Sequence, residues 1–243
     1  MGTAGATAVV QPSRPVRPGL RAAVWGVGVL AYVLAVMQRT TLGAAGLDAA
    51  AHFGITPGAL SLFVFLQVAV YMAGQLPAGV LVDRWGSRAV LAMSGLVLAA
   101  GQALLAVAPS LPLAALARVL VGSGDAMVFV AVLALVPRWF PASRVPLVTQ
   151  LTTILGQVGQ VLSAVPFLAL LHGAGWTPAF GIAAAASGVV ALLALCVVRD
   201  SPDGSRPSAV SVTAREVGHQ LAAVWRRPGT GWASSGTWGP SSR

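Results

Sequence analysis

Long apolar runs separated by short polar stretches make up most of the chain. Six of these runs reach bilayer length, because about 20 residues at helical rise cross the hydrocarbon core. They are rich in Ala, Leu, Val and Gly and lack the alternation of strands, so they predict helices rather than barrel strands. The predicted fold is all-α, a polytopic membrane protein with six transmembrane helices. The six runs lie near 22–40, 57–80, 89–108, 111–136, 145–171 and 177–198.

The composition places the chain in the lipid bilayer. It is 56% hydrophobic and only 9% charged over 243 residues, which no water-soluble domain of this size would tolerate. The formal net charge of +9 would suit a nucleic-acid partner, but the arginines are scattered at the ends of the apolar runs. Such arginines predict the orientation of membrane helices, so we expect no nucleic-acid partner.

The arginines predict that both termini are cytoplasmic. Three precede the first run, two follow the second, two follow the fourth and six follow the sixth. All of these fall on one side if the amino terminus is cytoplasmic, which is the side that positive charge favours. Only Arg39 and Arg118 break the pattern. We therefore expect a multi-pass protein of the cell (inner or plasma) membrane.

Three segments of different character are expected along the chain. Residues 1–21, with prolines and three arginines, predict a disordered basic cytoplasmic leader, and 22–198 form the six-helix transmembrane unit. Residues 199–243 predict a cytoplasmic linker or tail. From Gly231 onward this tail is rich in Trp, Gly and Ser and has no periodicity, so we expect it to be truncated or out of frame.

A charged turn between the second and third runs is the most informative motif. It reads Gly-Val-Leu-Val-Asp-Arg-Trp-Gly-Ser-Arg, and its glycine at 86 permits a turn that a side chain would block. Its aspartate is placed to cap a helix or to pair with an arginine of the turn. The spacing resembles the signature loop after the second helix in the major facilitator superfamily of secondary transporters. The alternative is a generic positive-inside turn. The motif residues are Gly79, Asp83, Arg84, Gly86 and Arg88.

Two opposite charges lie inside the fourth apolar run. Arg118 and Asp125 are seven residues apart, which places them on one helical face about 10 Å apart. Each would cost roughly 2.5 to 3.5 kcal/mol at the bilayer centre. Together with Gly122 and Gly124, Arg118 resembles the fourth-helix motif of the same superfamily, whose arginine is linked to proton coupling. We expect the pair to form a proton-coupling charge network, with a bundle-locking ion pair as the alternative.

Polar side chains at helical spacing in the second and fifth runs predict an aqueous cavity. Such stripes either line a cavity or hold helices together through hydrogen bonds. For any single glutamine, a role in holding helices together is at least as good an interpretation as a role in a cavity. With two charges nearby, we favour the cavity. An arginine near the outer end of the first run is a further candidate, unless it snorkels to the interface. The candidates are Gln67, Tyr71, Gln75, Gln150, Thr153, Gln157, Gln160 and Arg39.

No catalytic or metal-binding constellation is visible in the sequence. The three histidines, His52, His172 and His219, are far apart and show no ligand spacing. Paired carboxylates, a serine beside a histidine and phosphate-binding glycine loops are also missing. We therefore expect neither an enzyme nor a bound cofactor or metal.

The resemblance to the superfamily covers residues 22 to about 200, which corresponds to one six-helix half. Transporters of this kind have two halves, with a solute bound between them and access alternating between the two sides. The resemblance implies secondary active or facilitative transport of a small solute, with protons as a second partner. The fifth run lacks the mid-helix Gly-Pro pair of antiporters, which favours symport. The other expected partner is a missing second half or a second copy of the chain.

The main alternative is a chain that does not transport. A truncated inactive fragment, or a membrane protein that only assists a partner, would carry the same six apolar runs. Six further apolar helices in the downstream coding sequence would favour the transporter.

Overall fold

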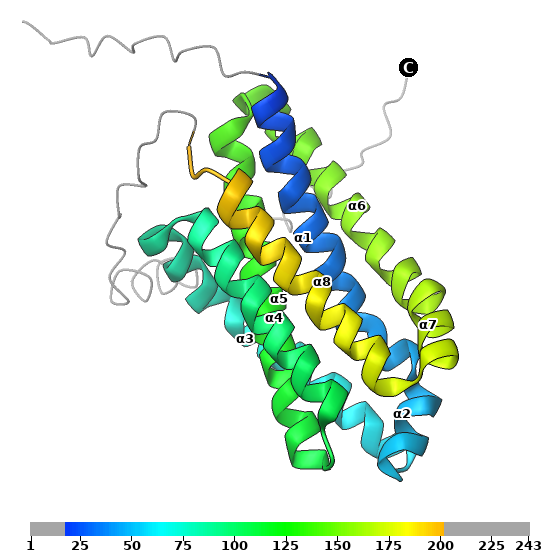
Figure 1. The fold of residues 1–243 in the computed structure, drawn as a ribbon. Coiled ribbons are helices and arrows are strands. Elements are labelled where there is room, and N and C mark those ends of the chain that lie inside the picture. Colours follow the sequence, from blue (N-terminus) through cyan, green and yellow to red (C-terminus); the bar gives the residue numbers. More distant parts are fainter. Residues whose placement is uncertain (1–17, 202–243) are drawn as a thin grey trace, which may run out of the picture. The chain divides into compact units, whose positions relative to one another are not determined.

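The chain divides into two units, Met1–Ser208 and Ala209–Arg243. The computed structural model describes residues 18–201, all within the first unit (Figure 1). The predicted tail after Ser201 and most of the predicted leader lie outside the described residues. The first helix already begins at Pro18, inside the range predicted for the leader.

Most of the described residues are helical, with no strand among them, and the all-α prediction is confirmed. Six spans between 19 and 197 are long and apolar enough to cross a membrane. The elements are α1 (Pro18–Ala44), α2 (Gly46–Phe53), α3 (Pro57–Trp85), α4 (Ser87–Val107), α5 (Leu111–Trp139), the 3-10 turn η1 (Ala142–Arg144), α6 (Val145–Ala164), α7 (Pro166–Ala174) and α8 (Trp176–Val197).

Two features of the helices were not predicted from the apolar runs. The connection between the first two spans contains the short helix α2, and the fifth span is divided into α6 and α7 at Val165. The break follows from Pro166, which has no amide hydrogen to continue the hydrogen-bond ladder of α6. The apolar character continues across the break, so hydropathy alone shows one run.

The local sequence explains where several helices begin and end. Pro57, Pro112, Pro146 and Pro166 lie at the first or second position of α3, α5, α6 and α7, where a missing amide hydrogen costs nothing. The turn between α3 and α4 is a single residue, Gly86, whose φ of 85° suits glycine best. A connection as short as this one makes α3 and α4 run in opposite directions.

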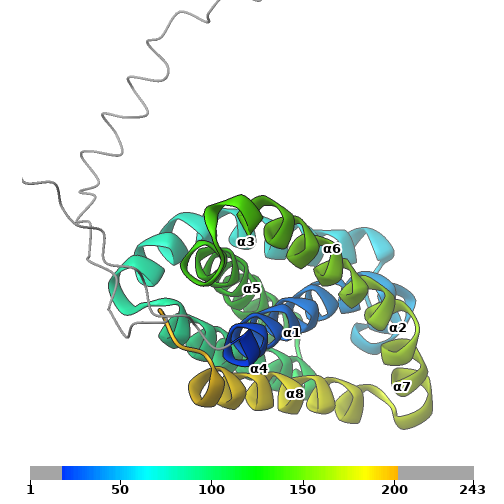
Figure 2. The same ribbon diagram turned by 90° about the horizontal axis from the view of Figure 1, so that it is seen from above.

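The helices form a bundle with two distinct ends. One end carries the start of α1, the α3–α4 turn and the end of α8; the other, here called the α2 end, carries α2 and α7 (Figure 1). Seen along the bundle, α1 and α5 lie at its centre (Figure 2). The helices α4 and α8 pack together on one side, while α3 packs on α5 and α6 packs on α1. Most functional candidates therefore lie on the central helices or their neighbours.

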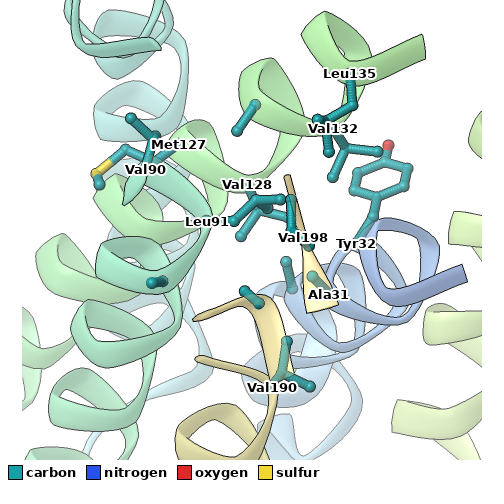
Figure 3. Packing of buried hydrophobic residues seen from close by; sticks show 14 of the residues in the cluster. Ala31, Tyr32, Val90, Leu91, Met127, Val128, Val132, Leu135, Val190 and Val198 are labelled. Atoms are coloured by element: carbon teal, nitrogen blue, oxygen red, sulfur yellow. The ribbon is translucent and has the colours of Figure 1, made fainter. Parts of the chain in front are cut away.

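Close helix packing in the core depends on small residues. The main cluster joins α1, α4, α5 and α8 through side chains such as Leu91, Val128 and Val190 (Figure 3). At Gly95 of α4, an added Cβ would lie 2.8 Å from the Cβ of Ala191 and 3.1 Å from its backbone nitrogen. Small residues of this kind let the backbones of membrane helices approach each other.

We expect Gly95→Ala to destabilise the bundle, because the new methyl group would push α4 away from α8. Overpacking of a tight core costs about 1–3 kcal/mol. Gly188→Ala on α8 is the matched control, because nothing lies within 4 Å of its added Cβ. The unfolding temperatures of both variants in detergent test this. Equal unfolding temperatures for the two variants would contradict the close packing at Gly95.

Candidate functional site

The centre of the bundle holds an ion pair between α1 and α5. The Nη1 atom of Arg39 donates a hydrogen bond to the Oδ2 atom of Asp125 over 3.1 Å. The side chain of Asp125 is fully buried, whereas 21% of the Arg39 side chain remains exposed. The pair therefore has one fully buried member and one that remains partly exposed.

Arg118 lies in the same region but forms no ion pair with Asp125. It is fully buried, and its Nη2 atom donates to the side-chain oxygen of Gln67 and, over 3.1 Å, to the backbone oxygen of Arg39. Within residues 18–201, the ion pairs are Arg39–Asp125 and His172–Asp48. The acceptors that hold Arg118 are neutral and do not balance its charge. With Asp125 ionised, the cluster Arg39–Arg118–Asp125 therefore has a formal charge of +1.

A glycine in α5 brings α3 close enough for the contact between Gln67 and Arg118. A Cβ added at Gly122 would lie 2.7 Å from the backbone oxygen of Gln67. Arg118 and Gly122 are one helical turn apart, so they lie on the same face of α5. That face therefore carries both the guanidinium and the glycine against which the backbone of α3 packs. This gives a physical reason for the motif that the sequence suggested.

Aromatic rings flank the accessible arginine. The Cζ atom of Arg39 lies 5.0 Å from the ring centroid of Tyr71, a distance suited to a cation–π contact. The Tyr71 ring neighbours Phe129 at 6.4 Å, and Phe129 neighbours the buried Tyr32 at 5.5 Å. These rings restrict the positions that the Arg39 side chain can take. Tyr32 and Phe129 were not predicted, because neither belongs to a stripe of polar side chains such as the one that singled out Tyr71.

Several buried polar atoms of the cluster have no hydrogen-bond partner among the described residues. They are Asp125 Oδ1, Gln67 Nε2, and Arg118 Nε and Nη1. Buried polar atoms are normally paired, since leaving one unpaired costs free energy. The cluster thus retains unused hydrogen-bonding capacity.

A second polar contact joins α1 to α8 on the other side of α1. The side-chain nitrogen of Gln38 donates to the backbone oxygen of Ala183 over 3.2 Å and to the hydroxyl of Ser187. Gln102 of α4 is also fully buried. Because Gln38 and Arg39 are adjacent, α1 makes polar contacts with two different neighbours at the same depth.

The remaining cavity candidates are not joined to the cluster. On α6, Gln150, Gln157 and Gln160 are exposed, and Gln160 donates to Gln157. Thr153 is half-buried and donates to the backbone oxygen of Thr149 over 3.0 Å. Gln75 of α3 is half-buried. The α6 residues therefore form a separate polar face on a membrane-spanning helix.

The charged turn between α3 and α4 contacts the residues after α8. The backbone nitrogen of Arg88 donates to Asp200 Oδ1 over 2.8 Å, and its Nη2 atom donates to the backbone oxygen of Leu195 over 2.5 Å. A Cβ added at Gly86 would lie 2.6 Å from the Asp200 carboxylate, so the turn needs glycine for space as well as for its φ. The only signal for this contact was an acidic residue directly after the sixth run.

The other residues of the turn lie apart from that contact. Asp83 and Arg84 are exposed at the end of α3, and the ion pairs of the described region do not include Asp83. A Cβ added at Gly79 would meet nothing within 4 Å. Within residues 18–201, no group of three His, Cys, Asp or Glu side chains is placed to hold a metal.

Comparison with known proteins identifies the class. The family model of the Major Facilitator Superfamily matches residues 28–239, and the chain belongs to this family of membrane transporters. Its sequence is 26% identical over 212 residues to a protein of Cupriavidus necator named probable sulfoacetate transporter SauU. The match covers 83% of this chain and 49% of the relative, so the chain spans about half the length of the curated relative it matches.

We expect Arg39 and Asp125 to be energetically coupled. Asp125→Asn leaves Arg39 without its charge partner, and Arg39→Gln leaves a buried carboxylate unpaired, so each single variant should be destabilised. The loss of unfolding free energy in the double variant should be smaller than the sum of the two single losses, by roughly 1–3 kcal/mol. The reason is that the double variant leaves no unpaired charge, whereas each single variant leaves one. Unfolding of the four proteins in detergent measures this. Additive losses would show that the pair contributes no coupling.

Proposed function

We propose that this chain is the amino-terminal, six-helix half of a secondary transporter that carries a small organic anion by alternating access. The observation that carries the proposal is the unequal charge of the central cluster, with two arginines to one aspartate. A buried excess of positive charge is costly unless an anion neutralises it. Binding of an anionic solute supplies that charge.

Arg39 is the residue we assign to solute binding. It is the partly exposed cation of the cluster, whereas Arg118 is fully buried behind Gln67 and the α1 backbone. A guanidinium binds carboxylate or sulfonate oxygens through two parallel hydrogen bonds. The name of the similar protein from Cupriavidus necator supports a solute of this class, since sulfoacetate carries both groups.

Asp125 is the residue we assign to proton coupling. An anion that binds Arg39 competes with Asp125 for the same guanidinium, and a carboxylate that loses its partner in a buried site is better accommodated with a proton. Anion and proton would then cross together, which is symport rather than antiport. Arg118 stays in place and holds the α1 backbone through the carbonyl of Arg39.

A second six-helix unit is the partner we propose for this chain. The exposed glutamines of α6 lie within a membrane-spanning segment, where polar side chains normally face protein or water rather than lipid. The chain matches about half of its relative, which leaves room for such a unit. The second unit would be a continuation of the chain, a separate protein or a second copy.

We expect the α2 end of the bundle to face away from the cytoplasm in the cell (inner or plasma) membrane. Reporter fusions after residues 84, 140 and 205 should report cytoplasm, and fusions near residues 50 and 174 should report the outer side. The physical reason is the concentration of arginines at the opposite end. A cytoplasmic signal from residue 50 would overturn this orientation.

We expect Asp125→Asn to abolish uphill accumulation of the solute while exchange or downhill flux continues, because the amide cannot carry a proton. The measurement is sulfoacetate uptake into vesicles with and without a pH gradient, in the assembly that transports. Asp125→Glu is the control, since it keeps a carboxylate that can carry a proton. Unchanged accumulation by Asp125→Asn would show that Asp125 is structural.

The need for a second unit is tested by expressing the chain alone in membranes. Its oligomeric state and its uptake of sulfoacetate should be measured on the same preparation. We expect the monomer not to transport, because half of the cavity wall would be missing. Transport by an isolated monomer would contradict the proposal, and transport by a stable dimer would identify a second copy as the partner.

A further inference from the structure

A glycine of α6 makes room for a tyrosine ring of α1. A Cβ atom added at Gly156 would overlap the Cδ1 and Cε1 atoms of Tyr32, so the ring occupies the space that a side chain at 156 would need. Only 4% of Tyr32 is exposed. Gly156 is therefore a notch in α6 that seats the Tyr32 ring.

Hydrogen bonds hold α6 against α1 on both sides of this notch. One turn before Gly156, the Nε1 atom of Trp25 donates to the hydroxyl of Thr152 over 2.9 Å. About two turns after it, the hydroxyl of Thr40 donates to that of Ser163 over 2.8 Å. Because α6 is fixed at both places, a larger side chain at the notch would act on the ring.

The Tyr32 ring is the first of three rings that lead to Arg39. Its centroid lies 5.5 Å from that of Phe129, which lies 6.4 Å from that of Tyr71. Both distances are within the range of favourable aromatic pairs. The three rings, here called the aromatic wall, come from α1, α5 and α3. The wall ends at Arg39, whose Cζ atom lies 5.0 Å from the Tyr71 centroid.

The wall bears on an arginine whose orientation matters. The Nη1 atom of Arg39 donates to Asp125, while 21% of the Arg39 side chain stays exposed. A long arginine side chain has many rotamers, and a ring packed on its guanidinium restricts them. Tyr32 and Arg39 are seven residues apart, so they also share one face of α1. The position of the guanidinium therefore depends on where the rings lie.

We propose that Gly156 and Tyr32 are positioning residues for Arg39. Gly156 seats the Tyr32 ring, and the aromatic wall then holds the guanidinium beside Asp125. Both residues act on the solute through Arg39. The consequence for solute binding rests on the proposed function, whereas the link between the notch and the wall does not.

The tyrosine content of the chain provides a reporter for the wall. The chain has two tyrosines, Tyr32 and Tyr71, and both belong to the wall. Incorporation of 3-fluorotyrosine therefore gives two fluorine NMR signals, and Tyr32→Leu removes one of them and assigns the other to Tyr71. Tyr71 lies on α3, so its signal reports an effect that has crossed from α6 to the far end of the wall.

The first test combines Gly156→Ala with Tyr32→Leu in the purified chain in detergent. We expect Gly156→Ala to move the Tyr71 signal by more than its linewidth when Tyr32 is present, and not when residue 32 is leucine. Gly181→Ala on α8 is the control, because nothing lies within 4 Å of its added Cβ. An unmoved Tyr71 signal, or an equal movement in both backgrounds, would overturn the proposal.

The second test uses Tyr32→Leu, which avoids overpacking at the notch, and measures sulfoacetate binding to the transporting assembly by calorimetry. We expect affinity to fall about three- to tenfold, as suits the loss of one ring from the wall. Gly156→Ala should lower affinity in the presence of Tyr32 and add nothing to Tyr32→Leu. Unchanged affinity in Tyr32→Leu would overturn the positioning role.

Failure of the proposed function has a different signature. In that case the wild-type assembly does not bind sulfoacetate, and the fluorine spectra, which need no solute, still test whether the notch positions the wall.

Discussion

The contact between Arg39 and Asp125 is the interaction on which the central site depends. Both groups lie within membrane-spanning helices, where an unpaired charge is expensive, and each provides the other with its closest opposite charge. The pair leaves Arg118 as the additional positive charge of the cluster, held by Gln67 and by the backbone of Arg39. The three charged residues are therefore mutually dependent, and a change at one alters the environment of the other two.

Close packing of the helices makes this arrangement possible. Gly122 admits the backbone of α3, which brings Gln67 to Arg118, and on the opposite side Gly124 lies against Ser94 and Leu98 of α4. The same helix face therefore supplies both a charged side chain and the space for its acceptor. The small residues are needed for the polar contacts, because hydrogen bonds between membrane helices form only where the helix backbones come close.

The sequence predicted the fold well because the bilayer imposes a simple rule. A span must be apolar for about 20 residues, and each long helix follows from such a run. Helix α2 is too short to give that signal, and the break before Pro166 lies inside a continuous apolar stretch. The arginine of the first span was identified as a candidate, yet its partner could not be read from the sequence, since Arg39 and Asp125 are 86 residues apart.

Other parts of the site depend on three-dimensional placement that no periodic pattern encodes. Arg118 and Asp125 share a helix face, but side chains of this length reach to neighbouring helices, and the direct ion pair is made with α1. Glutamines at equal spacing behave differently as well: Gln67 lies buried against Arg118, and Gln157 lies exposed on α6. The spacing of residues predicts which face of a helix they share, whereas the contacts of that face depend on how the helices pack in the bundle.

The most direct measurement of the central claim is binding of sulfoacetate to the transporting assembly at neutral pH, by titration calorimetry. If Arg39 holds the anion, Arg39→Gln should weaken binding about tenfold or more, the loss expected for a charge-assisted hydrogen bond. Arg84→Gln, at an exposed arginine outside the cluster, should leave binding unchanged. Equal affinity of the wild-type and Arg39→Gln proteins would contradict the account.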